Sequence, residues 1–218
     1  MSVLREGILE RNPAWVQLLG LCPLLAVSSS VATALGLAMA SAFVLVASNV
    51  TISLLRGAIP HFARLPVFVL IIATTTTIAT LVLEAYAYDL YARIALFVQI
   101  IVTNCMILAR AESFASQTGP ANALYDAIGT AIGFAIALLT LGAARELLGS
   151  GTLLANMDQL FGPAAAAWRV DVVPQAWSLL AVRLPPGAFI VAGLLLAVGQ
   201  AIRNRRQRPA SGTQEDRS

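Results

Sequence analysis

The chain has 218 residues, of which 58% are hydrophobic and only 11% charged, with a mean hydropathy of +0.80 and a formal net charge of +3. Soluble domains carry about 25% charged residues, so too few charges are present to build a polar surface, and most of this chain is expected to face lipid. The small net charge argues against nucleic acid as a partner, and the sequence has no nucleophile–base pair, phosphate loop or dinucleotide fingerprint.

Three membrane spans are predicted in the first half of the chain. A bilayer core of about 30 Å takes roughly 20 helical residues, so the uncharged run 12–55 suits two helices, placed at about 14–29 and 33–55. Pro23 and the serines at 28–30 weaken or break the first of them. The third span is predicted over about 66–86, with tyrosines at its end that favour the headgroup level.

The second half predicts three more spans, at about 93–110, 123–146 and 185–202. The last begins with "PPG", and proline is tolerated at a helix start because its missing N–H has no partner there. The spans at 14–29 and 93–110 are short. The sequence therefore predicts an all-α integral membrane protein, a single membrane domain over 1–218 with six transmembrane helices.

The arginines predict the orientation of these spans, because arginine-rich loops stay on the cytoplasmic side. With both termini cytoplasmic, most of the arginines lie inside: Arg5, Arg11, Arg56, Arg64, Arg110, Arg203, Arg205, Arg206 and Arg208. Only Arg93, Arg145, Arg169 and Arg183 lie at or beyond the outer face. The loop 147–183, with Trp168 and Trp177, is then external, and 204–218 forms a flexible cytoplasmic tail.

The two cysteines of the chain indicate a symmetry between its halves. Three spans per half make the second set run upside down, so residues 12–90 and 91–203 are predicted to form inverted repeats. Cys22 lies 11 residues after Arg11, and Cys105 lies 12 residues after Arg93. At 1.5 Å per helical residue each thiol is roughly 16–18 Å from its own interface, near the middle of a core of about 30 Å.

Several chemistries are open to two thiols at that depth. A membrane cysteine usually acts as a small apolar side chain, and a disulfide needs close Cα atoms and an oxidising environment. A cysteine-bound iron–sulfur cluster needs four thiolates, so this chain could supply only half of such a site and a second subunit would have to complete it. The positive iron offsets the cost of burying ionised thiolates in lipid.

Other polar features have ordinary explanations. The threonines of "ATTTTIAT" at 73–80 are expected to bond back to their own helix rather than line a path. Gly129 and Gly133 form a GxxxG pattern that brings helices close. Four carboxylates are candidates for an ion route, but they fall near span ends, where solvation is the favoured interpretation: Glu84, Glu112, Asp126 and Glu146.

Clustered motifs identify a family. The stretches "GLCPLLAVSSS", "SNVTISLLR", "IVTNCMILARAESFA", "RELLGSGTL" and "LPPGAFI" closely resemble the E subunit of the bacterial Rnf electron-transport complex, over roughly residues 5–203. The D subunit of the sodium-translocating NADH:quinone reductase shares the cysteine pattern. "LCPLLAV" and "LPPGAFI" are more similar to the Rnf form.

The resemblance implies a role in electron transfer between ferredoxin and NAD, coupled to movement of sodium ions or protons across the bacterial inner membrane. It implies that Cys22 and Cys105 are metal ligands to a [2Fe–2S] cluster shared with the homologous, oppositely inserted A subunit (RnfA-like) of that complex. Flavins and further iron–sulfur clusters would belong to the B, C, D and G subunits. Three alternatives remain: a D-like subunit of the sodium-translocating NADH:quinone reductase, a small-solute transporter built on an inverted repeat, and a structural anchor for soluble redox subunits.

Overall fold

The computed structural model describes residues 17–86, 88, 91–92, 98–153, 170–171 and 185–207. Their elements, in chain order, are α2 (Leu21–Val27), α3 (Val31–Leu55), η2 (His61–Ala63), α4 (Arg64–Tyr86), α6 (Cys105–Arg110), the π-helical turn η3 (Ala111–Ala115), α7 (Pro120–Ser150), β1 (Thr152–Leu153), β2 (Val170–Asp171) and α10 (Pro185–Gln207). The described chain is helical apart from this one strand pair, which is antiparallel and two residues long.

Four stretches of the described chain are long and apolar enough to cross a membrane: Val31–Leu55, Arg64–Tyr86, Val98–Ala115 and Pro120–Ser150. They correspond to the predicted spans at 33–55, 66–86, 93–110 and 123–146. The apolar part of α10, Pro186–Ala201, is shorter. The chain is therefore a multi-pass membrane protein, and the count of six spans stays a prediction.

The first predicted span is much shorter in the structure than in the sequence analysis. Between residues 17 and 30, only Leu21–Val27 is α-helical, preceded by a turn and followed by the bend at 28–30. The fourth span is also broken, because the chain turns at 101–104 before α6 begins at Cys105. The short or broken first helix predicted for each half is thus present, with a break before each cysteine that the sequence analysis missed.

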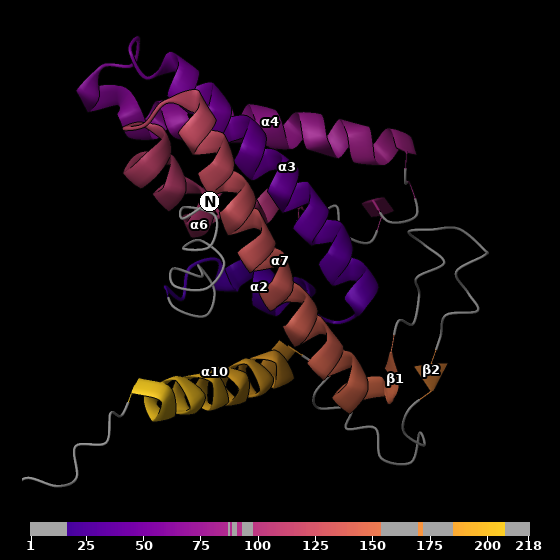
Figure 1. The fold of residues 1–218 in the computed structure, drawn as a ribbon. Helices are drawn as coiled ribbons and strands as arrows, with labels where there is room; N and C mark the ends of the chain where they lie inside the picture. Colours follow the sequence, from indigo (N-terminus) through magenta and orange to yellow (C-terminus); the bar gives the residue numbers. More distant parts are fainter. Residues whose placement is uncertain are drawn as a thin grey trace, which may run out of the picture.

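Helices α3 and α7 form the centre of the fold and lie side by side along much of their length (Figure 1). The C-terminal end of α3 lies beside the start of α7, since Ser53 Oγ donates to the carbonyl of Thr118 at 2.6 Å. At the other end, a Cβ on Gly142 of α7 would lie 3.1 Å from Ala34 Cβ of α3. The two helices therefore run antiparallel with closely spaced backbones, as small residues allow.

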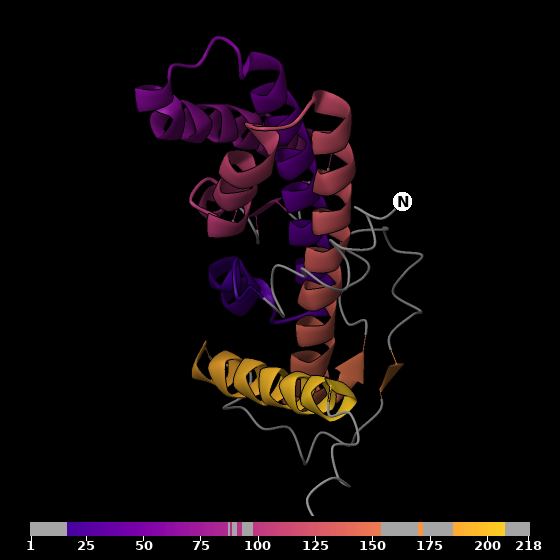
Figure 2. The same cartoon turned by 60° about the vertical axis from the view of Figure 1, so that its left-hand side comes forward.

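The remaining helices are arranged around this pair. Figure 2 shows α4 lying across one end and α10 across the other, with α2 and α6 between them on the same side. One buried apolar cluster joins α2, α3, α4, α6, α7 and α10, and a smaller one lies around Ile52 and Phe68. Gly129 and Gly133 are both buried on α7.

Local sequence signals explain where the long helices begin and end. Ser30 caps α3 by accepting the N–H of Thr33 at 3.3 Å. Pro120 occupies the first position of α7, where no N–H is needed. Gly151 ends α7 with a φ of 67°, a left-handed conformation that glycine adopts without steric cost.

The threonine run of α4 behaves as the sequence predicts. The hydroxyls of Thr74, Thr76, Thr77 and Thr80 each donate to the carbonyl four residues earlier, at 2.7–3.0 Å. These bonds satisfy the hydroxyls within the helix. The loop tryptophans and the residues 208–218 of the predicted tail lie outside the described residues, while the last helix continues to Gln207.

Replacing Gly142 by valine tests the packing of α3 against α7. The added side chain meets Ala34 Cβ and the carbonyl of Ser30, at 3.1 and 3.4 Å from its Cβ, so we expect a loss of about 1–3 kcal/mol. The measurement is the unfolding midpoint of the full chain in detergent. Gly193→Val in α10 is the matched control, because a Cβ there meets nothing within 4 Å. Equal midpoints for the two variants would contradict the packing.

Candidate functional site

The two cysteines lie at the starts of the two short helices. Cys22 is the second residue of α2, and Cys105 is the first residue of α6. Both thiols are free and exposed on this chain. The main-chain N–H of Gly20 donates a hydrogen bond to Cys105 Sγ at 3.1 Å, across 85 residues of sequence. The segments that carry the two cysteines are therefore in contact.

Gly20 permits this contact through its missing side chain. Its φ of 77° lies in the left-handed region, which residues with a Cβ rarely adopt. A Cβ at this position would lie 3.0 Å from Phe134 Cε2 and 3.4 Å from Asn104 Oδ1. Only glycine thus combines this backbone conformation with so close an approach to α6 and α7.

Asn104 fixes the start of α6. Its Oδ1 accepts the main-chain N–H of Met106 at 3.0 Å, which is an N-cap bond. Its Nδ2 is buried and has no hydrogen-bond partner among the described atoms. A buried polar nitrogen without a partner costs about 1–3 kcal/mol, and this one belongs to the residue that directly precedes Cys105.

The described residues contain no group of three or more His, Cys, Asp or Glu side chains able to hold a metal ion. The chain has two cysteines in total. What the arrangement offers is a pair of exposed thiols, one of which accepts the N–H of Gly20. Any thiolate beyond these two would have to come from another chain.

The bend between α2 and α3 is held by the C-terminal end of α7. Arg145 Nη1 donates to Ser28 Oγ at 3.0 Å and to the carbonyl of Leu25 at 3.4 Å. Glu146 Oε2 accepts the main-chain N–H of Val31, the first residue of α3, at 2.8 Å. Both charged side chains are buried, and they fix the helix that carries Cys22.

The turn between η3 and α7 is held in the same way by the end of α3. Ser53 Oγ donates to the carbonyl of Thr118, and Arg56 Nη1 donates to the carbonyl of Gln117 at 3.4 Å. The end of α7 therefore lies against the bend that precedes α3, and the end of α3 lies against the turn that precedes α7.

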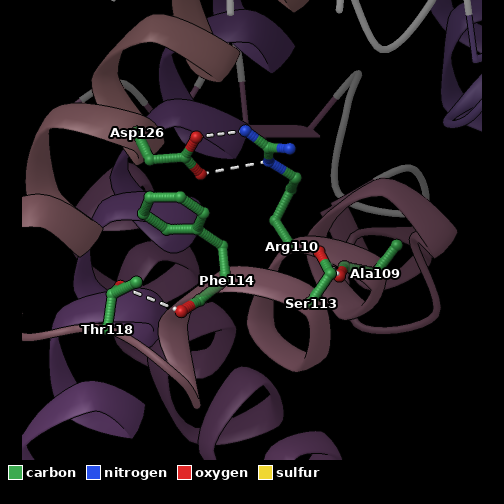
Figure 3. Close-up of polar contacts among 6 residues, drawn as sticks. All are labelled: Ala109, Arg110, Ser113, Phe114, Thr118 and Asp126. Atoms are coloured by element: carbon green, nitrogen blue, oxygen red, sulfur yellow. Dashed lines mark hydrogen bonds and ion pairs between the residues drawn. The ribbon is translucent and has the colours of Figure 1, made fainter. Parts of the chain in front are cut away.

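A buried ion pair joins α6 to α7. Arg110 Nε donates to Asp126 Oδ2 at 3.0 Å, Arg110 Nη2 pairs with Asp126 Oδ1, and the guanidinium lies 5.7 Å from the centre of the Phe114 ring (Figure 3). The side chain of Arg110 is 12% exposed and that of Asp126 is 3% exposed. The pair fixes the C-terminal end of the helix that begins with Cys105.

The four candidate carboxylates therefore divide into two kinds. Glu84 and Glu112 are exposed, in keeping with their predicted place at span ends. The solvated interpretation is wrong for Asp126 and Glu146, because both are buried and hydrogen-bonded. Their partners are distant in sequence, so no local pattern predicted these contacts.

Gly20 and Asn104 were not predicted as part of the site. Each precedes a cysteine, by two residues and by one residue, and the short helices begin directly after them. Asparagine is among the residues that favour the cap position. That preference was the one signal in the sequence for Asn104.

Comparison with known proteins shows the family to which the chain belongs. The model of the Rnf-Nqr family, described as "Rnf-Nqr subunit, membrane protein", matches residues 1–196. The chain belongs to this family of membrane subunits.

Individual relatives are similar over most of their length. A protein of Pseudomonas paraeruginosa is 50% identical over 201 residues, which cover 92% of this chain and 84% of the relative. One of Haemophilus ducreyi is 48% identical over 90% of this chain and 87% of the relative, and one of Vibrio vulnificus is 50% identical over 92% and 87%. Each is named as the E subunit of an ion-translocating oxidoreductase complex.

Removing one partner of the Arg110–Asp126 pair should destabilise the fold. In Asp126→Asn the largely buried guanidinium loses its counter-charge, and we expect a loss of about 3–5 kcal/mol. Replacing both partners, as Arg110→Met with Asp126→Leu, should recover most of that loss.

The measurement is again the unfolding midpoint in detergent, and the control is Glu112→Gln, since Glu112 is exposed. If Asp126→Asn unfolds at the same midpoint as Glu112→Gln, the pair does not hold α6 to α7.

Proposed function

We propose that this chain is the E subunit of an ion-translocating oxidoreductase complex, and that Cys22 and Cys105 hold half of a [2Fe–2S] cluster that relays electrons across the membrane. The subunit name comes from relatives of about 50% identity over most of the chain. The single observation that carries the cluster is the bond from Gly20 N–H to Cys105 Sγ, which brings the two cysteine segments together.

The residues present fit such a group. Both thiols are exposed on this chain, so each of them is accessible to a second subunit. Cysteine-bound clusters of this type take four thiolates, and two chains with two cysteines each supply that number. The donors at Gly20 and Asn104 are of the kind that stabilise ligand sulfurs.

When bound, the cluster would act as a one-electron carrier between a reduced centre of one partner subunit and an oxidised centre of another. The contribution of this chain is to hold its two sulfurs in place. α2 is fixed at its end by Arg145, and α6 is fixed by Asn104 at its start and by Arg110 at its end. Without partners the chain catalyses no reaction, so it acts as one subunit of an oxidoreductase.

The contacts between the halves support an inverted repeat. Ser30 and Val31 are the N-cap and the first residue of α3, and Gly119 and Pro120 hold the same positions in α7. The separation in sequence from Ser30 to Gly119 equals that from Val31 to Pro120. The same separation relates Arg56 to Arg145. Arg56 donates to Gln117 in the turn between η3 and α7, and Arg145 donates to Ser28 in the bend between α2 and α3. Repeats of three spans in opposite orientation would explain why the two segments that carry the cysteines approach each other from opposite ends of the α3–α7 pair.

The partner that completes the site is, in this proposal, the homologous and oppositely inserted A subunit, with two cysteines of its own. The B, C, D and G subunits supply the flavins and other iron–sulfur clusters between which electrons pass. The lipid environment is the bacterial inner membrane, with both termini cytoplasmic. Arg56 and Gln117 lie at one end of the α3–α7 pair and Arg145 at the other, in keeping with that orientation.

The test of the cluster is to replace each cysteine by serine in the intact complex, prepared without oxygen. We expect Cys22→Ser and Cys105→Ser each to abolish one [2Fe–2S] signal in electron paramagnetic resonance and to remove two irons per complex. The complex itself should still assemble, because neither exposed thiol belongs to the buried core.

Thr77→Ser, an exposed hydroxyl change on α4, is the control and should leave the signal at full strength. Full signal and full iron content in both cysteine variants would refute the proposal. Full electron transfer without either thiol would instead favour an anchor, and solute transport by the purified chain would favour a transporter.

A further inference from the structure

Two hydrogen-bond donors of this chain belong to the surroundings of Cys105: the main-chain N–H of Gly20 bonds its Sγ, and the amide of Asn104 belongs to the residue before it. We propose that the main-chain N–H of Gly20 and the side-chain amide of Asn104 raise the reduction potential of the cluster by donating to its sulfur atoms. This inference rests on the proposed function, because it concerns the same cluster.

The physical basis is the charge on the sulfurs. Reduction adds one electron, so the reduced state carries one more negative charge than the oxidised state. An N–H donor stabilises the more negative state more strongly, and hydrogen bonds to the sulfurs are one of the features that set the potentials of iron–sulfur clusters.

The bond from Gly20 is present in the structure and is fixed by the backbone. Its nitrogen lies 3.1 Å from Cys105 Sγ. The left-handed φ of 77° orients the N–H, and Phe134, Asn104 and Met106 surround the place where a Cβ would lie. The donor therefore has little freedom to turn away from the sulfur.

Asn104 supplies the second, independent observation. It is 2% exposed, and Nδ2 has no partner among the described atoms although Oδ1 is used in the cap bond to Met106. Buried amide nitrogens nearly always have an acceptor. A cluster bound at the adjacent Cys105 would provide this acceptor, either a thiolate sulfur or a sulfide sulfur.

Two substitutions remove these donors in different ways. Asn104→Ser keeps an oxygen that caps α6, since serine is a good cap residue, but it removes the amide. Gly20→Ala places a Cβ 3.0 Å from Phe134 Cε2 at a φ that alanine rarely adopts, so the N–H must shift from Cys105. Gly57→Ala is the matched glycine control, because a Cβ there meets nothing within 4 Å.

The measurement is a redox titration of the intact complex with dithionite and mediators, monitored by the [2Fe–2S] signal in electron paramagnetic resonance. We expect Asn104→Ser and Gly20→Ala each to make the midpoint more negative. The ratio of reduced to oxidised cluster at a fixed ambient potential should fall roughly tenfold, which corresponds to a shift of about 59 mV for one electron. Iron content should stay at the wild-type value in Asn104→Ser.

The outcomes separate this inference from the proposed function. A wild-type complex without the signal, or one whose signal survives both cysteine substitutions, contradicts the cluster itself. A signal that is present in Asn104→Ser with the midpoint of wild type and Gly57→Ala overturns the inference and leaves the cluster intact. Because Asn104→Ser keeps the cap, it decides the question even where Gly20→Ala fails to assemble.

Discussion

The approach of Gly20 to Cys105 joins the two segments that carry the cysteines, and the proposed cluster site depends on this contact. A main-chain N–H lies 3.1 Å from a thiol sulfur that is 85 residues away in sequence. The approach requires a glycine in the left-handed region against the ring of Phe134. It brings together the starts of two helices of seven and six residues, which are too short to be stable by themselves.

The long helices supply the stability that the short ones lack. α3 and α7 pack antiparallel through small residues, and each ends against the break of the other half. Arg145 and Glu146 hold the bend after α2, while Arg110 joins the end of α6 to α7 through Asp126. Buried charges of this kind are costly unless paired, so the positions of the two cysteines are set by specific polar contacts.

Hydropathy and length were sufficient to predict the helical membrane fold and four of the spans. The short first helix of each half also followed from Pro23, the serines at 28–30 and the limited length of the fourth span. The burial of Asp126 and Glu146 did not follow, because it depends on partners such as Arg110 that sequence spacing does not reveal. Gly20 was not predicted because its role comes from its close approach to Cys105 and Phe134, which are distant in sequence.

An electron cryomicroscopy map of the intact complex, prepared without oxygen, would show whether Cys22 and Cys105 share a cluster with a second subunit. We predict density for two irons bonded to Cys22 Sγ and Cys105 Sγ on one side and to two sulfurs of a neighbouring membrane subunit on the other. Cysteine sulfurs that face lipid with no metal between them and no second pair nearby would contradict it.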